Sequence, residues 1–498
     1  MKKFICLLTA LCLLVTGAGC AGPGAVESGA QNDDIKQGTA ELPEIGLTDG
    51  DGEFPAALPE KPEEKPHEKP VVKPEEKPHE KPAVKPEEKP HEKPAVKPEQ
   101  KPEQKPEPQP KPETKPEPRP EQKPTPQPKP VPAPGEEMRA VWISYLELRG
   151  MLKGNTESGF REQFAAACRN AKNLGLNTVI AHARPFGDAL YRSDIFPTSY
   201  LITGTEGDPL PFDPLAVMIE TAHGEGLRLE AWVNPYRVRA NGKQPPICSE
   251  NPARKFLDSG SETVYTYNNG IYYNPGSDEA VDLIVRGIEE IVRNYDVDGI
   301  HFDDYFYATT EKSIDSGLYS RNGGGLSIGD WRRANVNGMV KKVYAAIKAI
   351  KPSVRFGISP QGNTAINYGT LYADAATWAG SSGYIDYLCP QIYFGFNHAT
   401  HDFAKTAAEF SSLIKTDSVD LCFGLAAYKI GKPDLYAGDS GRGEWQNNSD
   451  LLARMVTEAR GTAHYGGLAL YSYQSLFSPA ADVKNQVGSE LAALGKVL

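Results

Sequence analysis

Between residues 297 and 307 the chain reads Val297-Asp298-Gly299-Ile300-His301-Phe302-Asp303-Asp304-Tyr305-Phe306-Tyr307. The Asp-Gly pair is typical of a turn, and the apolar residues that follow it predict a buried strand. Because side chains alternate along a strand, Ile300 and Phe302 share one face, and His301, Asp303 and Tyr305 share the other. The strand thus ends in carboxylates that can transfer protons and in rings that can stack on a sugar. The alternative is a polar strand end that faces solvent, where paired carboxylates beside three aromatic residues are uncommon.

From Glu136 to Leu498, apolar runs of strand length alternate with helical patterns. Strands are predicted at residues 139–144, 177–184, 228–234, 299–305, 354–359, 385–393, 421–428 and 468–473. Helices are predicted around residues 159–174, 214–225, 277–294, 330–350, 371–378, 403–414, 449–460 and 479–498. Eight alternating units indicate an α/β fold closed as a (β/α)8 TIM barrel, in one domain over residues 136–498. The alternative is an open doubly wound sheet, which usually has a Gly-rich phosphate turn after its first strand; residues 144–147 (Ser-Tyr-Leu-Glu) do not provide one.

Polar and aromatic residues recur at the predicted C-terminal strand ends, the face on which barrel enzymes carry their active sites. Planar donors and acceptors suit sugar hydroxyls, and aromatic faces suit the C–H surfaces of pyranose rings. Singly, each residue has a structural interpretation: Arg184 with Asp188 as a loop staple, or Tyr393 as core. Together they predict one substrate cleft, with candidate binding residues Trp142, His182, Arg184, Asp188, Asn234, Tyr236, Arg237, His301, Tyr305, Gln391, Tyr393 and Tyr473.

Asp303 and Asp304 are the candidate catalytic residues. Glycoside hydrolysis needs an acid for the leaving oxygen, and a carboxylate or the substrate's own acetamido group for the oxocarbenium-like centre. Adjacent strand residues point in opposite directions, so both aspartates can serve only if the strand breaks at Asp304. Otherwise Asp188 or Glu444 would supply the second carboxyl. A carboxyl beside aromatic rings is partly desolvated, which raises its pKa and suits it to act as an acid.

Two loops are long for a compact domain. Residues 238–276 follow the third strand, and residues 308–329 follow the fourth. Long loops on the active face of a barrel commonly build the binding groove. We therefore expect a cleft open enough for a polymer.

The N-terminus predicts export. Lys2 and Lys3 precede an apolar run from Phe4 to Val15, which is too short to span a membrane, and small residues lead to Cys20. Residues 1–20 are therefore predicted to be a lipoprotein signal, with Cys20 lipidated and the protein anchored to the outer side of the bacterial cell membrane. Gly17 stands where such signals usually have leucine. The alternatives are a secretory signal cleaved without lipidation and an uncleaved anchor.

Two low-complexity segments follow the signal. Residues 21–54 are acidic and lack the apolar content of a core, which predicts disorder. Residues 55–135 hold 26 of the 43 prolines in a Pro/Lys/Glu repeat. At roughly 3.1 Å per residue in polyproline II, such a linker reaches on the order of 200 Å and suits a spacer across a cell wall.

Charge and cysteine content exclude several function classes. A formal net charge of -11 argues against nucleic acid as the main partner. Cys168, Cys248, Cys389 and Cys422 form neither a disulfide scaffold nor a CxxC zinc motif, so buried thiols are expected, with one disulfide as the alternative. A metal-dependent reaction at His301, Asp303 and Asp304 would have only His182 as a nearby second imidazole. We expect neither metal nor cofactor.

At several ordered motifs the chain resembles a bacterial family of glycosyl-hydrolase-like lipoproteins formerly known only as a domain of unknown function. The resemblance covers about residues 136–473 and rests on residues 139–142 (Arg-Ala-Val-Trp), 184–189 (Arg-Pro-Phe-Gly-Asp-Ala), 234–237 (Asn-Pro-Tyr-Arg), 298–307 and 390–393 (Pro-Gln-Ile-Tyr). It implies a TIM barrel in an envelope-associated protein that cleaves peptidoglycan glycan strands, best attested on strands stripped of stem peptides.

Two more distant resemblances concern the fourth strand. Residues 299–303 are similar to the α-amylase pattern, which implies that Asp303 is a nucleophile, but Ser359 stands near the position where those enzymes have a glutamate acid. Residues 298–305 are also similar to the family-18 chitinase motif, whose glutamate would fall at Tyr305. The identity of the acid therefore stays open.

The sequence thus predicts an exported, membrane-anchored glycoside hydrolase that acts on cell-wall glycan. One alternative is a non-catalytic glycan-binding module that tethers the membrane to the wall. Another is a glycosidase of a different polysaccharide.

Overall fold

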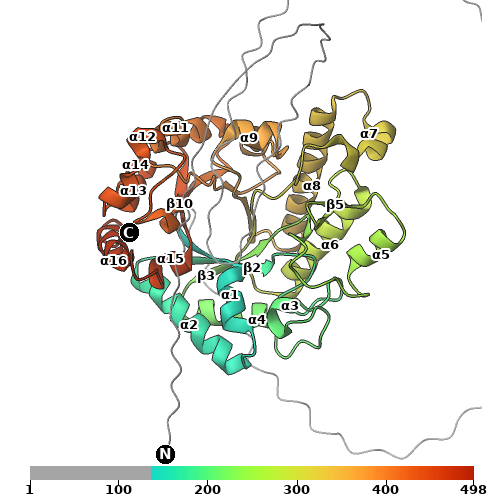
Figure 1. Ribbon diagram of the computed structural model, residues 1–498, viewed down its shortest axis with the longest axis horizontal. Helices are drawn as coiled ribbons and strands as arrows, with labels where there is room; N and C mark the ends of the chain where they lie inside the picture. Colours follow the sequence, from blue (N-terminus) through green and yellow to red (C-terminus); the bar gives the residue numbers. More distant parts are fainter. Residues whose placement is uncertain (1–135) are drawn as a thin grey trace, which may run out of the picture. The chain divides into compact units, whose positions relative to one another are not determined.

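The computed structural model describes residues 136–498, and these form a closed barrel of eight parallel strands surrounded by helices (Figure 1). The barrel order is β1-β11-β10-β9-β8-β7-β3-β2. The strands are β1 (Met138–Ile143), β2 (Thr178–Arg184), β3 (Arg228–Val233), β7 (Gly299–Phe302), β8 (Arg355–Ile358), β9 (Tyr387–Leu388), β10 (Asp420–Ala426) and β11 (Tyr465–Tyr471). The predicted TIM barrel is confirmed. The predictions for residues 1–20, 21–54 and 55–135 lie outside the described residues.

Eight helices correspond to the predicted ones. They are α2 (Glu157–Asn173), α4 (Pro214–Gly224), α6 (Asp278–Asn294), α8 (Ile328–Ile350), α10 (Ala375–Gly380), α11 (Phe403–Leu413), α14 (Leu451–Arg460) and α16 (Lys484–Leu494). Their starts follow local chemistry: Asp213 caps α4 by accepting a hydrogen bond from the Ala216 N–H at 3.1 Å, and Pro214 follows at the first helical position. Within residues 136–498, no helix is both long and apolar enough to cross a bilayer.

Shorter elements fill the connections between strands and helices. They are α1 (Tyr145–Leu152), α3 (Tyr200–Thr203), α5 (Pro252–Asp258), η1 (Lys312–Ile314), α7 (Ser316–Asn322), α9 (Thr364–Gly369), η2 (Ala427–Lys429), α12 (Gly438–Gly441), α13 (Glu444–Asn447) and α15 (Tyr473–Phe477). η1 and α7 occupy the long loop after β7, which the sequence identified without its helices.

The long loop after β3 folds into a small antiparallel sheet, which the sequence analysis treated as loop. Its order is β4-β6-β5, from β4 (Arg237–Arg239), β6 (Gly270–Tyr273) and β5 (Val264–Tyr267). Asn268 and Asn269 join β5 to β6 with φ of 46° and 59°. Asparagine tolerates this left-handed region, and two such residues form the turn that matches the twist of a hairpin.

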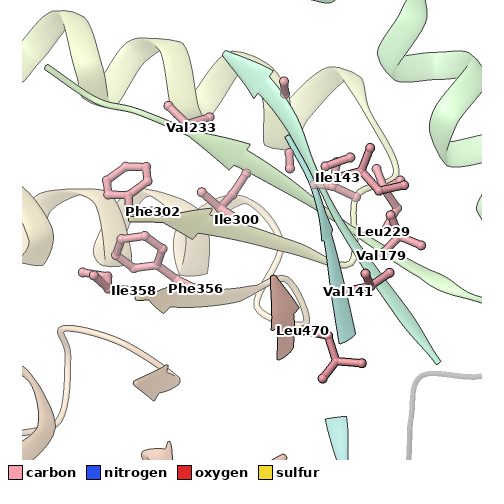
Figure 2. Close-up of a cluster of buried hydrophobic side chains, with 14 of the residues drawn as sticks. Val141, Ile143, Val179, Leu229, Val233, Ile300, Phe302, Phe356, Ile358 and Leu470 are labelled. Carbon is pink, nitrogen blue, oxygen red and sulfur yellow. The ribbon is translucent and has the colours of Figure 1, made fainter. Parts of the chain in front are cut away.

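The two faces of the barrel strands differ in chemistry. The outward face is aliphatic and aromatic: Figure 2 shows Val141, Val179, Leu229, Ile300 and Phe356 in one cluster, and these belong to the main hydrophobic core. The inward face carries larger polar side chains, including Glu230, His301 and Tyr387. Glycine makes room for them, because a Cβ on Gly357 would lie 1.9 Å from the Tyr387 ring and one on Gly299 would lie 2.7 Å from the Glu230 side chain.

The described cysteines are free thiols. Cys168, Cys389 and Cys422 are buried, and Cys248 is partly exposed. The expected burial therefore holds for three of these four thiols and not for Cys248.

Candidate active site

Strand β7 ends at Phe302, three residues earlier than the sequence predicted. Phe302 pairs with Val233 of β3 on one side and with Ile358 of β8 on the other, and these are the last residues of both neighbouring strands. Pro235 and Pro360 follow closely and cannot donate to a ladder. Asp303 consequently has no neighbouring strand to pair with. From Asp303 onward, side chains need not point alternately to the two faces of the sheet, so Asp303 and Asp304 need not point in opposite directions.

Asp303 is surrounded by hydrogen-bond donors. Its Oδ2 accepts from Trp232 Nε1 at 3.1 Å and from Asn234 Nδ2, and its Oδ1 accepts from the Tyr305 backbone N–H at 3.2 Å. The side chain is 2% exposed. Burial raises the pKa of Asp303 above its ordinary value, while the positive charge of Arg237 and these hydrogen bonds oppose the rise. The three donors and Arg237 favour the ionised form of Asp303, against the effect of burial.

Asp304 has weaker support for a negative charge. Its Oδ1 accepts from Gln391 Nε2 at 3.1 Å, and Gln391 is held in turn by the Ser359 carbonyl oxygen at 3.0 Å. Burial, and then the negative charge of Asp303, raise the pKa of Asp304 to about 7. The two neighbours therefore differ: Asp303 accepts hydrogen bonds from three donors, whereas the Asp304 side chain accepts one from Gln391.

Aromatic rings lie around the carboxylates. The Arg237 guanidinium stacks 4.4 Å from the Tyr305 ring centroid and donates to the Pro185 carbonyl oxygen at 3.1 Å. Tyr393, Tyr428 and Tyr471 form a second group, with centroid separations of 5.6 and 6.0 Å from Tyr393. These residues lie at or shortly after the C-terminal ends of barrel strands. Tyr305, Arg237, Gln391 and Tyr393 were all predicted from the sequence.

His301 lies inside the barrel, below the carboxylates. Trp142 Nε1 donates to His301 Nε2 at 3.2 Å, so the proton of the neutral ring is on Nδ1, which lies 2.7 Å from the Tyr387 hydroxyl. Tyr387 donates to Glu230. Burial lowers the pKa of His301 to about 3 and raises that of Glu230 to about 7. Trp142 and His301, predicted to bind substrate, thus belong to an interior hydrogen-bond chain.

Three further predicted binding residues are fully enclosed. Arg184 lies 4.4 Å from the Phe196 ring and Asp188 lies 3.7 Å from Arg239; both, with Tyr236, have 0% exposure. Burial lowers the pKa of Arg184 and raises that of Asp188 to about 6. The proposed staple between Arg184 and Asp188 does not form, because Asp188 pairs with Arg239 instead. These three residues are enclosed by the protein rather than facing solvent.

Two other candidates lie elsewhere. Tyr473 begins α15, and its hydroxyl accepts from Asn170 of α2 at 2.9 Å. The predicted strand over residues 468–473 extended past the end of β11, so the tyrosine at the strand end is Tyr471 and not Tyr473. Glu444 accepts from the backbone N–H groups of Phe396 and Asn397 at 3.1 and 2.9 Å, so it serves as a loop staple.

Several contributing residues were not among the sequence candidates. Trp232 could have been found from the sequence, because alternation along β3 places it on the same inward face as Glu230. Tyr471 could have been found in the same way, because alternation along β11 places it on the same face as Ala469. Tyr145 could not have been found in this way, since its position depends on the turn between β1 and α1.

Across residues 136–498, no group of three His, Cys, Asp or Glu side chains is arranged to hold a metal ion. The imidazole of His301 is committed to Trp142 and Tyr387.

A family model described as glycosyl hydrolase-like 10 matches residues 137–439. The chain belongs to this family. The resemblance that the sequence motifs indicated is therefore confirmed. Among curated relatives, glycosyl hydrolase YngK of Bacillus subtilis (strain 168) is 41% identical over 319 residues, which cover 59% of this chain and 61% of that protein. Glycosyl hydrolase DigH of Escherichia coli (strain K12) is 35% identical over 291 residues, which cover 54% of this chain and 66% of that protein.

Among solved structures, the PgaB (BpsB) glycoside hydrolase domain from Bordetella bronchiseptica is 12% identical, with a TM-score of 0.48, over 71% of this chain and 99% of that one. The chain described here matches less than two thirds of the length of either curated relative, YngK or DigH.

Proposed function

We propose that this protein is a glycoside hydrolase whose reaction is carried by Asp303 and Asp304. The observation that supports the proposal most directly is the division of roles between two consecutive buried carboxyls. Asp303 is stabilised as an anion by Trp232, Asn234 and the Tyr305 N–H. The pKa of Asp304 is raised to about 7 by burial and by the negative charge of Asp303, so this carboxyl is protonated below that pH. Glycoside hydrolysis requires one group of each kind.

In this mechanism Asp304 is the general acid. A carboxyl with a pKa of about 7 is largely protonated below neutral pH and can give its proton to the leaving oxygen. Asp303 supplies the negative charge that the oxocarbenium-like centre needs. The aromatic rings of Tyr305 and Tyr393 offer C–H stacking surfaces for sugar rings. Gln391 holds the acid in place through its amide nitrogen.

The proposed substrate is an N-acetylated cell-wall glycan, namely peptidoglycan strands stripped of stem peptides. The support is the family resemblance together with a sequence that predicts export. The proposed location follows from the same N-terminal features: a lipid on Cys20 anchors the protein to the outer side of the membrane, and the linker over residues 55–135 lets the barrel reach the wall.

The function is tested by treating denuded glycan strands with the full-length protein and identifying products by mass spectrometry. Shorter glycans from the wild type, and none from Asp303→Asn, are expected. Intact peptidoglycan that carries stem peptides serves as the matched substrate, and equal cleavage of both would contradict the proposed preference. Binding without products would indicate the glycan-binding module, and products only from other polysaccharides would indicate a different glycosidase.

The anchor is tested by metabolic labelling with a fatty-acid analogue. The wild type should be labelled and Cys20→Ser should not. Equal labelling of both proteins would contradict lipidation at Cys20.

A further inference from the structure

His182 contacts two residues that donate hydrogen bonds to Asp303, namely Trp232 and Asn234. The imidazole, on strand β2, is 1% exposed and stacks on the Trp232 indole, with centroids 3.5 Å apart and an interplanar angle of 19°. Trp232 donates to Asp303 through its ring nitrogen. His182 therefore supports the face of one of the residues that stabilise the Asp303 anion.

The hydrogen bonds of His182 define its tautomer. The Tyr145 backbone N–H donates to His182 Nδ1 at 3.0 Å, and a backbone N–H can act only as a donor. Nδ1 is consequently the acceptor, and the proton of the neutral ring is on Nε2. Burial and the positive charge of Arg237 lower the pKa of His182 well below its ordinary value, which is consistent with a neutral ring.

The Nε2 proton of His182 points to Asn234. His182 Nε2 lies 2.9 Å from Asn234 Oδ1, and Arg237 donates to the same oxygen at 3.0 Å. Two donors on one side fix the carboxamide so that its oxygen faces them and its NH2 group faces away. The NH2 group donates to Asp303 Oδ2. A flipped carboxamide would set its NH2 against two donors and its oxygen against a carboxylate.

We propose that His182 is a positioning residue that acts on Asp303 through Asn234 and Trp232. The Nε2–H of His182 orients the Asn234 amide so that the amide donates to Asp303 and keeps that carboxyl ionised and fixed. The effect on catalysis rests on the proposed function, whereas the effect on the Asp303 carboxyl does not. Sequence reasoning assigned His182 to substrate binding, and its enclosure beneath the site gives it this indirect role instead.

Two conservative substitutions separate the donor from the rest of the ring. In His182→Gln, the side-chain nitrogen reaches the position of Nε2 and can still donate to Asn234. In His182→Asn, the shorter amide can accept from the Tyr145 N–H but cannot reach Asn234. For the full-length protein we expect kcat to fall about tenfold to a hundredfold in His182→Asn, with KM nearly unchanged, and to recover to within about threefold of wild type in His182→Gln.

The pH dependence of kcat/KM separates a positioning role from a packing role, because loss of packing alone would not shift it. Asp303 also faces Arg237 and Asp304, which both variants retain. Loss of the oriented amide weakens the ionised form of Asp303, so the acidic limb of the kcat/KM profile should move to higher pH in His182→Asn and stay in place in His182→Gln. Equal losses in both variants with an unmoved limb, or no change in either, would overturn the proposal.

A second measurement separates this proposal from the proposed function. The Asp303 carboxyl can be titrated by 13C NMR in aspartate-labelled full-length protein without substrate, with the resonance assigned by its absence in Asp303→Asn. The pKa of Asp303 should rise in His182→Asn and not in His182→Gln, whether or not the wild type cleaves glycan. An unchanged Asp303 pKa in His182→Asn would refute the positioning role, while failure of the wild type to cleave any glycan would refute only the enzymatic function.

Discussion

Glu230 and the pair Asp303–Asp304 are buried carboxyls in two regions of the barrel, and the two regions differ in what holds them. Glu230 lies among the inward side chains of the strands, where Tyr387 donates to it and His301 completes the chain. Asp303 and Asp304 lie just beyond the end of β7. Burial raises the pKa of Glu230 and of Asp304 alike, to about 7 in both. A raised pKa therefore does not distinguish a catalytic carboxyl from a structural one.

What distinguishes the regions is the partner set and the position relative to the strand ends. The Glu230 chain is made by side chains that the ladder holds in place, and it includes no second carboxyl. At the mouth of the barrel, two consecutive carboxyls share one environment, and only one of them is surrounded by donors. Proton transfer to a substrate needs the arrangement at the barrel mouth, where one carboxyl can hold a proton beside an ionised one. The following experiments test this contrast, from the largest expected effect to the smallest.

Replacing Asp303 by Asn should abolish glycan cleavage while leaving the fold intact. Asn keeps the shape of the side chain and removes its charge, so turnover should fall at least about a thousandfold, equivalent to about 4 kcal/mol of barrier. Steady-state kinetics and thermal unfolding measure the two effects. A near wild-type rate, or a large drop in melting temperature with residual turnover, would identify Asp303 as a structural carboxylate.

Replacing Asp304 by Asn should remove the acid. Cleavage of glycan should fall about 100- to 1,000-fold, within the range of general acid catalysis, whereas an activated aryl glycoside, whose leaving group needs no proton, should lose less than about tenfold. In the wild type, activity on glycan should decline as pH rises through about 7, because Asp304 loses its proton there. Equal losses on both substrates would exclude the acid role.

Replacing Glu230 by Gln should change stability rather than chemistry. The folded-state pKa of Glu230 is raised from about 4.5 to about 7, so its contribution to stability is full below pH 4.5 and is lost as pH rises through 7. Gln does not titrate and still accepts from Tyr387. Between pH 5 and pH 8, the free energy of unfolding should therefore fall less in the variant, by on the order of 3 kcal/mol.

Denaturant unfolding at both pH values measures this difference, and kcat should stay within about threefold of wild type. The shifts of Asp304 and Asp188 have the same sign, so part of the pH dependence remains in the variant. A thousandfold loss of turnover would instead place Glu230 in the catalytic machinery.

Replacing Tyr473 by Phe should have the smallest effect. The change removes only the hydrogen bond from Asn170, so the free energy of unfolding should drop by about 1 kcal/mol and kcat/KM should stay within about twofold. Chemical denaturation and kinetics check both values. More than a tenfold loss of kcat/KM would return Tyr473 to the substrate site, as the sequence alone had suggested.

The sequence by itself determined the barrel and the position of its candidate chemistry. Alternation of apolar strands and amphipathic helices is a local pattern, and eight repeats of it leave few alternatives to closure. The same local pattern placed Ile300 and Phe302 outward and His301 inward, as the structure has them. Asp303 and Asp304 were recognisable because two carboxylates beside aromatic residues are uncommon at a strand end.

Only the tertiary structure decided how those side chains divide their roles. The early end of β7 depends on where β3 and β8 end, because a strand lasts only as long as its neighbours offer pairing partners. The enclosure of Arg184, Asp188 and Tyr236 depends on loops packed over them. The indirect role of His182 depends on a backbone N–H from another strand end, at Tyr145. Contacts between residues far apart in the chain set burial and hydrogen bonding, and no local pattern encodes them.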